Sequence, residues 1–148
     1  MKTRGFEVLS TWKDKDIHIP VRKTAESAGY DIESGETIDL PAGKVTLIHT
    51  GLKAYMQPDE YLAIHIRSSM AIKHGLVLVN ATGIIDADYY NNEDNEGHIM
   101  AAILNTNGES YHIEKGDRIA QGIFAKYLTA DNDHAEGIRK GGVGSTGI

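Results

Sequence analysis

Short stretches in which apolar residues alternate with polar ones dominate this chain, and they predict β-strands. In YLAIHI, which starts at Tyr61, every second residue from Leu62 to Ile66 lies on one face of an extended chain. Four more segments are strand-like in their apolar and β-branched content: KVTLIHTGLKAYM, GLVLVNATGII, GHIMAAIL and ESYHI. The turn sequences ESGE, LPAGK, QPDE, NTNGES and EKGD separate them. Short strands at this spacing predict an all-β fold, either a barrel or a sandwich.

Two segments depart from this pattern. RSSMAIKHGL predicts a short helix that Ser68 or Ser69 caps and Gly75 ends. The last residues, EGIRKGGVGSTGI, are rich in glycine and hold little that could pack. We therefore expect one β domain over 1–130 and a flexible glycine-rich arm over 131–148.

Composition narrows the classes of function. With 148 residues, 24% of them charged and 41% hydrophobic, the chain is typical of a single globular domain. It has no cysteine, which excludes thiolate chemistry and fits a cytoplasmic protein. The net charge of −6 argues against nucleic-acid binding, and no apolar run predicts a signal peptide or a membrane span. A small anionic ligand remains compatible with the charge if cations cluster locally.

Common nucleotide and metal signatures are missing from the sequence. GGVGSTG lacks the lysine of a Walker A loop, the seven histidines have no metal-binding spacing, and there is no G-x-S-x-G motif. The predicted strand–helix junction at Arg67 offers another phosphate site, because helix N-terminal N–H groups and a guanidinium both bind phosphate oxygens. A capped helix beside a surface arginine explains these residues equally well.

The segment GIIDADYY has carboxylates directly after a predicted strand. Asp86 is placed to orient and deprotonate water, and Asp88 lies on the same face if the chain stays extended. Tyr89 offers a flat face for a sugar or a base. From these residues alone, a solvated acidic turn and an ordinary buried tyrosine are favoured. GDRIAQ, with Arg118 and Gln121, likewise favours a turn that enters a buried strand over an anion site.

Five segments together resemble the motifs of the trimeric deoxyuridine triphosphatases (dUTP diphosphatases), in the order of that family. They are AGYDI (28–32), RSSMAIKHGL (67–76), NATGIIDADY (80–89), GDRIAQGIF (116–124) and RKGGVGSTG (139–147). The resemblance covers nearly the whole chain. It implies a distorted antiparallel β-barrel or jelly roll with one short helix, assembled as a homotrimer with shared active sites.

The resemblance also implies a reaction, the hydrolysis of dUTP to dUMP and pyrophosphate with Mg²⁺ as cofactor. Asp86 is then the general base that activates water at the α-phosphate. The Mg²⁺ ion would bind the triphosphate, and Asp31 would contact the hydrated ion through water. Asn80 would recognise uracil with its amide, and Tyr89 would pack under the deoxyribose. The other contacts that the family implies are main-chain bonds to uracil from Gly83, Ile84, Ile85 and Met100, phosphate contacts from Arg67, Ser68, Ser69 and Gln121, and closure of the arm through Arg139, Gly144, Ser145 and Thr146.

Two features differ from the family pattern. Val143 occupies the position where the family usually has a phenylalanine that stacks on uracil, and the loop from Tyr90 to Glu96 is longer than usual. We expect Tyr90 or His98, from this longer hairpin, to supply the apolar cover that Val143 lacks.

Two alternatives remain open. The dCTP deaminases share the fold and many motifs, but they usually lack the Asp-x-Asp-Tyr run of Asp86–Tyr89. The second alternative is a dUTPase-like regulator from a mobile element that binds another protein. The acidic Asn91–Glu96 loop could bind a basic protein partner, although a solvated hairpin is favoured.

Overall fold

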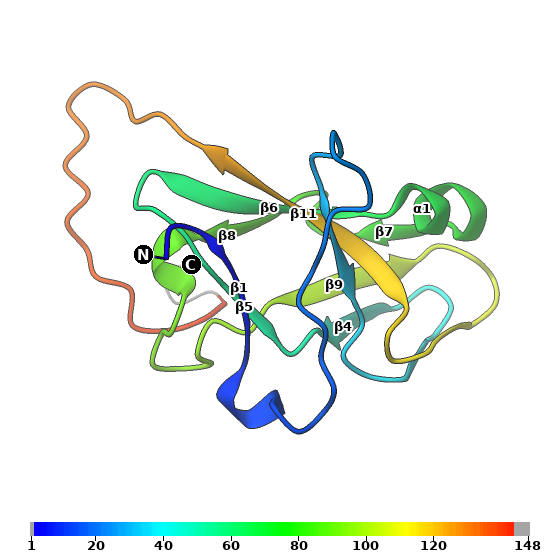
Figure 1. The fold of residues 1–148 in the computed structure, drawn as a ribbon. Helices are drawn as coiled ribbons and strands as arrows, with labels where there is room; N and C mark the ends of the chain where they lie inside the picture. The colour runs from blue at the N-terminus through cyan, green and yellow to red at the C-terminus, as the bar shows by residue number, and fades with distance from the viewer. Residues whose placement is uncertain (1, 144–148) are drawn as a thin grey trace.

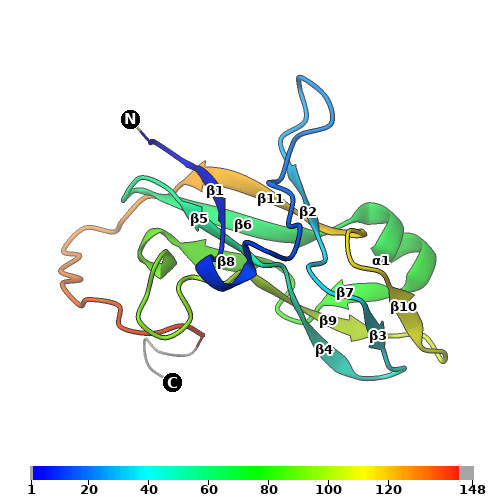
Figure 2. The ribbon, with the colours of Figure 1, turned by 60° about the horizontal axis from the view of Figure 1, so that its bottom comes forward.

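The structure, a computed structural model, describes residues 2–143, which fold as antiparallel strands around one core (Figure 1, Figure 2). The strands are β1 (Gly5–Val8), β2 (Tyr30–Glu33), β3 (Ile38–Leu40), β4 (Val45–His49), β5 (Leu52–Tyr55), β6 (Glu60–Ile66), β7 (Leu76–Leu78), β8 (Gly83–Asp86), β9 (Met100–Asn105), β10 (Tyr111–Ile113) and β11 (Arg118–Lys126). One α-helix, α1 (Ser68–His74), and two 3-10 turns, η1 (Ser10–Trp12) and η2 (Ala87–Tyr89), complete the described part. The predicted all-β class with one short helix is confirmed.

Two sheets form the body of the molecule. One has the order β2-β11-β6-β8 and the other the order β4-β9-β7, while β1 pairs with β5 and β3 with β10. Apolar residues of both larger sheets meet in the core, among them Ile32 and Leu62 from the first and Ile48 and Ile103 from the second. The arrangement is jelly-roll-like, and it leaves β8 at the edge of its sheet.

Two segments that were predicted as single strands are each split in two. KVTLIHTGLKAYM divides into β4 and β5 at Gly51, whose φ is +76°. A Cβ on Gly51 would lie 2.8 Å from the Trp12 ring, so glycine meets both the backbone and the space requirement there. GLVLVNATGII divides into β7 and β8 at a tight turn in which Ala81 has a φ of 65°. The second turn separates Asn80 from the strand that carries Asp86.

The helix α1 is one residue offset from the predicted capping. Its N-cap is Arg67, which makes no side-chain capping bond, so the prediction that Ser68 or Ser69 caps the helix is wrong. Both serines instead lie inside the first turn. The C-terminal prediction is confirmed, because Gly75 is left-handed and its N–H donates to carbonyls of the preceding turn.

The β4-β9-β7 sheet is apolar on both faces. Its inner face is fully buried through residues such as Ile48 and Ile103. Its outer face exposes Val45, Leu47 and Val77, which are 53%, 46% and 38% accessible. A sheet that is apolar on both sides is typical of one that is covered on both sides.

The chain after Lys126 has no helix or strand up to Val143. It runs back along the molecule, orange to red in Figure 1, and reaches the turn that follows β8. The division into a 1–130 domain and a 131–148 arm remains a prediction. No helix in residues 2–143 is long and apolar enough to span a membrane.

Candidate active site

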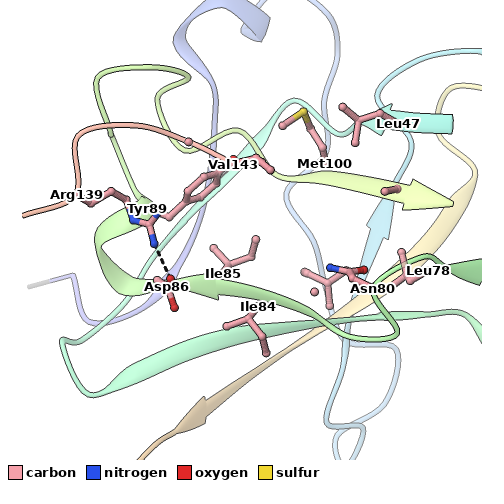
Figure 3. Close-up of a pocket in the computed structure, with 14 residues that line it drawn as sticks. Leu47, Leu78, Asn80, Ile84, Ile85, Asp86, Tyr89, Met100, Arg139 and Val143 are labelled. Atoms are coloured by element: carbon pink, nitrogen blue, oxygen red, sulfur yellow. Dashed lines mark hydrogen bonds and ion pairs between the residues drawn. The ribbon is translucent and has the colours of Figure 1, made fainter. Parts of the chain in front are cut away.

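A cavity of about 330 Å³ lies where the edge strand β8 faces the β4-β9-β7 sheet (Figure 3). The residues that line it are Leu47, Ile64, Leu78, Asn80, Gly83, Ile84, Ile85, Asp86, Tyr89, Met100, Ala102, Arg139, Gly142 and Val143. Its walls are largely apolar, and its polar side chains are few and placed at its ends (Figure 3). This is the usual composition of a small-molecule site.

Strand β8 sets one wall of the cavity. It pairs with β6 on one side only, with Gly83 opposite Ile64 and Asp86 opposite Tyr61. A Cβ on Gly83 would lie 3.2 Å from the Ile64 Cβ, so glycine lets the two strands approach closely. Because β8 is an edge strand, the N–H and C=O groups of its other side have no strand partner within residues 2–143. They are available to a ligand that carries its own donors and acceptors.

Two carboxylates and an arginine meet at the end of β8. Arg139, from the C-terminal arm, places Nη2 2.6 Å from Asp86 Oδ2 (Figure 3). Its Nε lies 2.8 Å from Asp88 Oδ1. The side chain of Asp86 is 54% accessible, whereas that of Arg139 is only 10% accessible. Arg139 bonds Oδ2 of this accessible carboxylate, which lines the cavity, and makes no hydrogen bond to Oδ1.

Tyr89 is a fixed part of the wall. It ends the 3-10 turn η2 and is buried, and its hydroxyl donates to the His98 carbonyl over 2.6 Å. The same hydroxyl accepts a hydrogen bond from Asn95 Nδ2 over 2.9 Å. Burial raises the pKa of Tyr89, so the phenol stays neutral and acts as a donor. The Arg139 guanidinium lies 5.8 Å from the centre of the ring.

A second cavity, of about 340 Å³, lies at the start of α1. Arg67, Ser69 and Arg118 line it, and Arg67 Nη1 donates to the Arg118 carbonyl over 3.4 Å. Gln121 lies on β11, where it is opposite Asp31 of β2. Its side chain packs closely on Gly29, because a Cβ on Gly29 would lie 2.3 Å from Gln121 Oε1. This second cavity shares no lining residue with the first.

Asp31 has an unusual environment for a carboxylate. Its Oδ2 atom is buried and has no hydrogen-bond partner within residues 2–143. The Arg118 Nη1 atom lies 3.5 Å away, at ion-pair distance but outside hydrogen-bond geometry. No group of three or more His, Cys, Asp or Glu side chains that could hold a metal occurs in this part of the chain. A single buried carboxylate suits a water-mediated metal contact better than a direct cage.

The predicted site residues therefore fall into two groups. The first cavity brings together Asn80, Gly83, Ile84, Ile85, Asp86, Tyr89, Met100 and Arg139. Arg67, Ser68, Ser69, Gln121 and Asp31 lie outside it, at the other end of β6. Along β6, Arg67 lies six residue steps beyond Tyr61, which is opposite Asp86, and this is a span of roughly 20 Å. The predicted contacts of Gly144, Ser145 and Thr146 lie outside the described residues.

The expected aromatic cover is wrong. The Tyr90 hydroxyl donates to Glu7 over 2.6 Å, and its ring packs on Tyr55, away from the cavity. His98 is buried, and its Nε2 accepts the Gly51 N–H over 2.9 Å. Neither residue lines the cavity, because the hairpin turns both toward the N-terminal strands. Val143 itself lines it.

Several lining residues were missed from the sequence. Leu47 and Ala102 face the cavity because β4 and β9 pair in a register that places them opposite one another. Gly142 reaches it through the return of the arm. Strand alternation could have put Leu47 and Ala102 on one face, but no local signal gives the pairing of two distant strands.

Comparison with known proteins agrees with this geometry. A family model described as dUTPase matches residues 15–148. The deoxyuridine 5′-triphosphate nucleotidohydrolase of Lactococcus lactis is 52% identical over 149 residues, which cover 99% of this chain and 99% of that protein. The crystal structure of dUTPase from Streptococcus mutans has a TM-score of 0.82 and 44% identity, over 86% of this chain and 99% of that one. The dUTPase of Staphylococcus bacteriophage 80alpha has a TM-score of 0.76 and 26% identity. The chain belongs to the dUTPase family.

Proposed function

We propose that this chain hydrolyses dUTP to dUMP and pyrophosphate, and that Asp86 is the general base that activates the attacking water. The activity follows from the family and from the match with a dUTP nucleotidohydrolase along nearly the whole chain. The role of Asp86 is supported by one observation above all. Its accessible carboxylate stands at the end of an edge strand, at the rim of a largely apolar cavity.

The chemistry at Asp86 is a displacement at phosphorus. One carboxylate oxygen is held by Arg139, which fixes the orientation of the group. The other oxygen takes a proton from water as the water oxygen bonds to the α-phosphorus. The bond between the α-phosphorus and the oxygen that bridges to the β-phosphate breaks, and pyrophosphate leaves with that oxygen.

Uracil would lie along the free edge of β8. Main-chain groups from Gly83 to Ile85 would bond its polar edge as a neighbouring strand does, and the Asn80 amide would add a donor and an acceptor. Cytosine presents the reverse pattern, which would leave buried polar groups unpaired and cost affinity. Tyr89 would pack under the deoxyribose, where its two hydroxyl hydrogen bonds hold the ring against a 2′-hydroxyl.

Mg²⁺ fits the residues of the second group. The buried, unpartnered Asp31 Oδ2 would accept a hydrogen bond from a water of a hydrated ion. When bound, Mg²⁺ spreads the negative charge of the triphosphate. Arg67, Ser68, Ser69 and Gln121 would hold the phosphate oxygens beside it.

A homotrimer with shared sites would reconcile the two groups. Within one chain, Asp86 and Arg67 lie roughly 20 Å apart, too far to act on one triphosphate. The exposed apolar face of β4-β9-β7 suits a subunit interface, and Leu47 belongs both to that face and to the cavity. A neighbouring chain packed on this face would stand at the rim of the cavity, where it can bring its own Arg67 to the phosphates.

The test is a product assay with each deoxynucleoside triphosphate. Pyrophosphate should be released from dUTP and only weakly from the others, and Asp86→Asn should lower kcat by about 10²–10⁴-fold with nucleotide affinity retained. Ammonia from dCTP without pyrophosphate would instead make the chain a deaminase. An Asp86→Asn variant that keeps most of its activity would place the base elsewhere.

A further inference from the structure

The loop after Tyr89, from Tyr90 to Glu96, is a turn with a defined conformation. Asn91 and Glu96 both have positive φ, 57° and 64°. The buried Asn92 side chain donates to the Tyr89 carbonyl over 2.8 Å, and its Oδ1 accepts the N–H groups of Asp94 and Asn95 over 3.0 and 3.1 Å. Asparagine tolerates such turns because its side chain bonds its own backbone. The shape of the loop is therefore set by its own residues.

One side of the loop is anchored to the body of the protein. Lys53 Nζ lies 2.6 Å from Asn91 Oδ1 and 2.7 Å from Glu96 Oε2. Glu96 also accepts the Ser10 hydroxyl over 2.6 Å and the Ser10 N–H over 3.0 Å. These bonds are charge-assisted, and Lys53 is nearly buried, so the loop cannot shift without breaking them.

The other side of the loop contacts two parts of the cavity wall. Asn95 Nδ2 donates to the Tyr89 hydroxyl over 2.9 Å, and Asn95 Oδ1 accepts the Gly97 N–H over 3.0 Å. Asp94 Oδ2 accepts the N–H of Gly142 in the arm over 3.3 Å. A Cβ on Gly142 would lie 2.6 Å from Asn95 Nδ2. Glycine at position 142 therefore allows the arm to contact the loop closely.

We propose that Asp94 and Asn95 are positioning residues for the reaction: Asp94 holds the C-terminal arm against its own chain's cavity, and Asn95 holds the Tyr89 ring. The proposal rests on the proposed function for its effect on catalysis, but the docking of the arm stands apart from it. It also gives the longer loop an intramolecular role, and the protein partner of this loop stays a prediction.

The docking point sets the register of the arm. Gly142 on Asp94 leaves two residues between the docked N–H and Arg139, which then reaches both Asp86 and Asp88. Gly142 and Val143 become lining residues in the same step. A loop that lost Asp94 would keep its turn, because Asn92 and Lys53 hold it, but it would free the arm at Gly142 and leave it anchored through Arg139.

Trypsin tests the docking without any substrate. Cleavage after Arg139 or Lys140 removes the arm end, and mass spectrometry of the intact protein detects it. In the wild type this cleavage should be slow, because the ion pairs of Arg139 and the hydrogen bond of the Gly142 N–H fix the chain on both sides of the two bonds. Asp94→Ala should speed it several-fold, and Glu93→Ala, in the same loop with no side-chain hydrogen bond in residues 2–143, should leave it unchanged. Equal rates for Asp94→Ala and the wild type would overturn the docking.

Selectivity for dUTP over UTP tests the proposed role of Asn95. Asn95→Ala should lower the ratio of kcat/KM for dUTP to that for UTP by about 10-fold, because a freed Tyr89 ring no longer excludes a 2′-hydroxyl. Asn95→Gln should restore part of the ratio, and the melting temperature of each variant separates unfolding from repositioning. A ratio unchanged in Asn95→Ala would contradict the role of Asn95. If the wild type hydrolysed no dUTP, the proposed function would fail while the trypsin result would still stand.

Discussion

The two ends of β6 present opposite chemistry. At one end, Tyr61 pairs with Asp86, and the neighbourhood is acidic and apolar, with the first cavity beside it. At the other end, Arg67 and Arg118 line a polar cavity beside the buried Asp31. The first end has what a base, a sugar and an activated water need, and the second has what phosphates need.

This difference supports the proposal that one chain contributes to two different active sites. A strand is stiff over this length, so no local motion brings Arg67 to Asp86 across roughly 20 Å. The apolar outer face of β4-β9-β7 adjoins the first cavity through Leu47 and Met100. If both groups act on one nucleotide, as in the proposed function, two chains have to contribute to each site.

A charge on the outer face of the β4-β9-β7 sheet should have the largest effect on kcat/KM. Val77→Glu places a charge on that face, on its edge strand β7, and the chain should become monomeric by light scattering. Because the phosphates would then lose several charge-assisted hydrogen bonds, each worth about 1.5–3 kcal/mol, kcat/KM should fall by roughly 10³-fold or more. Ile72→Glu, on the exposed side of α1, is the control and should change neither mass nor rate. A fully active Val77→Glu monomer would show that one chain suffices.

Replacing Arg67 should affect substrate binding, whereas replacing Asp86, at the other end of β6, should affect the chemical step. Arg67→Ala should raise KM for dUTP by about 10–100-fold with a smaller change in kcat, because it removes binding and not the base. Asp86→Asn should instead lower kcat, with a smaller change in KM. Lys73→Ala, at the far end of the same helix, serves as the matched control. A fall in kcat alone for Arg67→Ala would argue against a phosphate-binding role.

Lowering the pH should lower the free energy of unfolding through His98. Burial, helped by the nearby His49, lowers the pKa of His98 to about 4, against 6.5 in the unfolded chain. Between pH 6.5 and 4 the unfolded chain binds more protons, so stability falls as the pH falls and levels off below about pH 4. From pH 7 to pH 5 the loss should be about 2 kcal/mol in the free energy of unfolding.

Urea unfolding across this pH range measures the effect. His98→Gln removes the titrating group, so its stability should change less over the same range, whatever its absolute value. Glu96 contributes in a lower window, because Lys53 and Ser10 lower its pKa to about 2, and that stability is lost as the pH falls from about 4.5 toward 2. A His98→Gln curve parallel to the wild type above pH 4.5 would contradict the assignment to His98.

The smallest effect is expected at Asp88. It shares Arg139 with Asp86 but is 61% accessible and does not line the cavity. Asp88→Asn should lower kcat only a few-fold, since an exposed ion pair is worth about 0–1 kcal/mol. A loss as large as that of Asp86→Asn would show that the two carboxylates share the role of base.

Much of this organisation could be predicted from the sequence, for physical reasons that are local. The alternation in YLAIHI predicts β6, Gly75 predicts the end of α1, and the strand that precedes Asp86 predicts an exposed carboxylate at a strand end. Each of these depends on residues within one or two turns of the chain. The motif order then gave the family that the comparisons confirm.

What could not be predicted depends on contacts between distant segments. The pairing of Leu47 with Ala102, the docking of Gly142 on Asp94, and the turn of Tyr90 toward Glu7 are settled by packing, not by periodicity. The acidic loop after Tyr89 looked like a solvated surface because each of its partners lies far away in the chain: Ser10, Lys53 and Gly142.

Complementation between two defective chains tests the shared site most directly. Asp86→Asn and Arg67→Ala, each nearly inactive at low dUTP, are co-expressed with different tags and purified as mixed assemblies. If every site takes Asp86 from one subunit and Arg67 from its neighbour, about one quarter of the sites in a random equal mixture are intact, and activity should recover to about one quarter of the wild type. Mixed assemblies that stay as inactive as their parents would contradict the account, because Asp86 and Arg67 would then have to act within one chain.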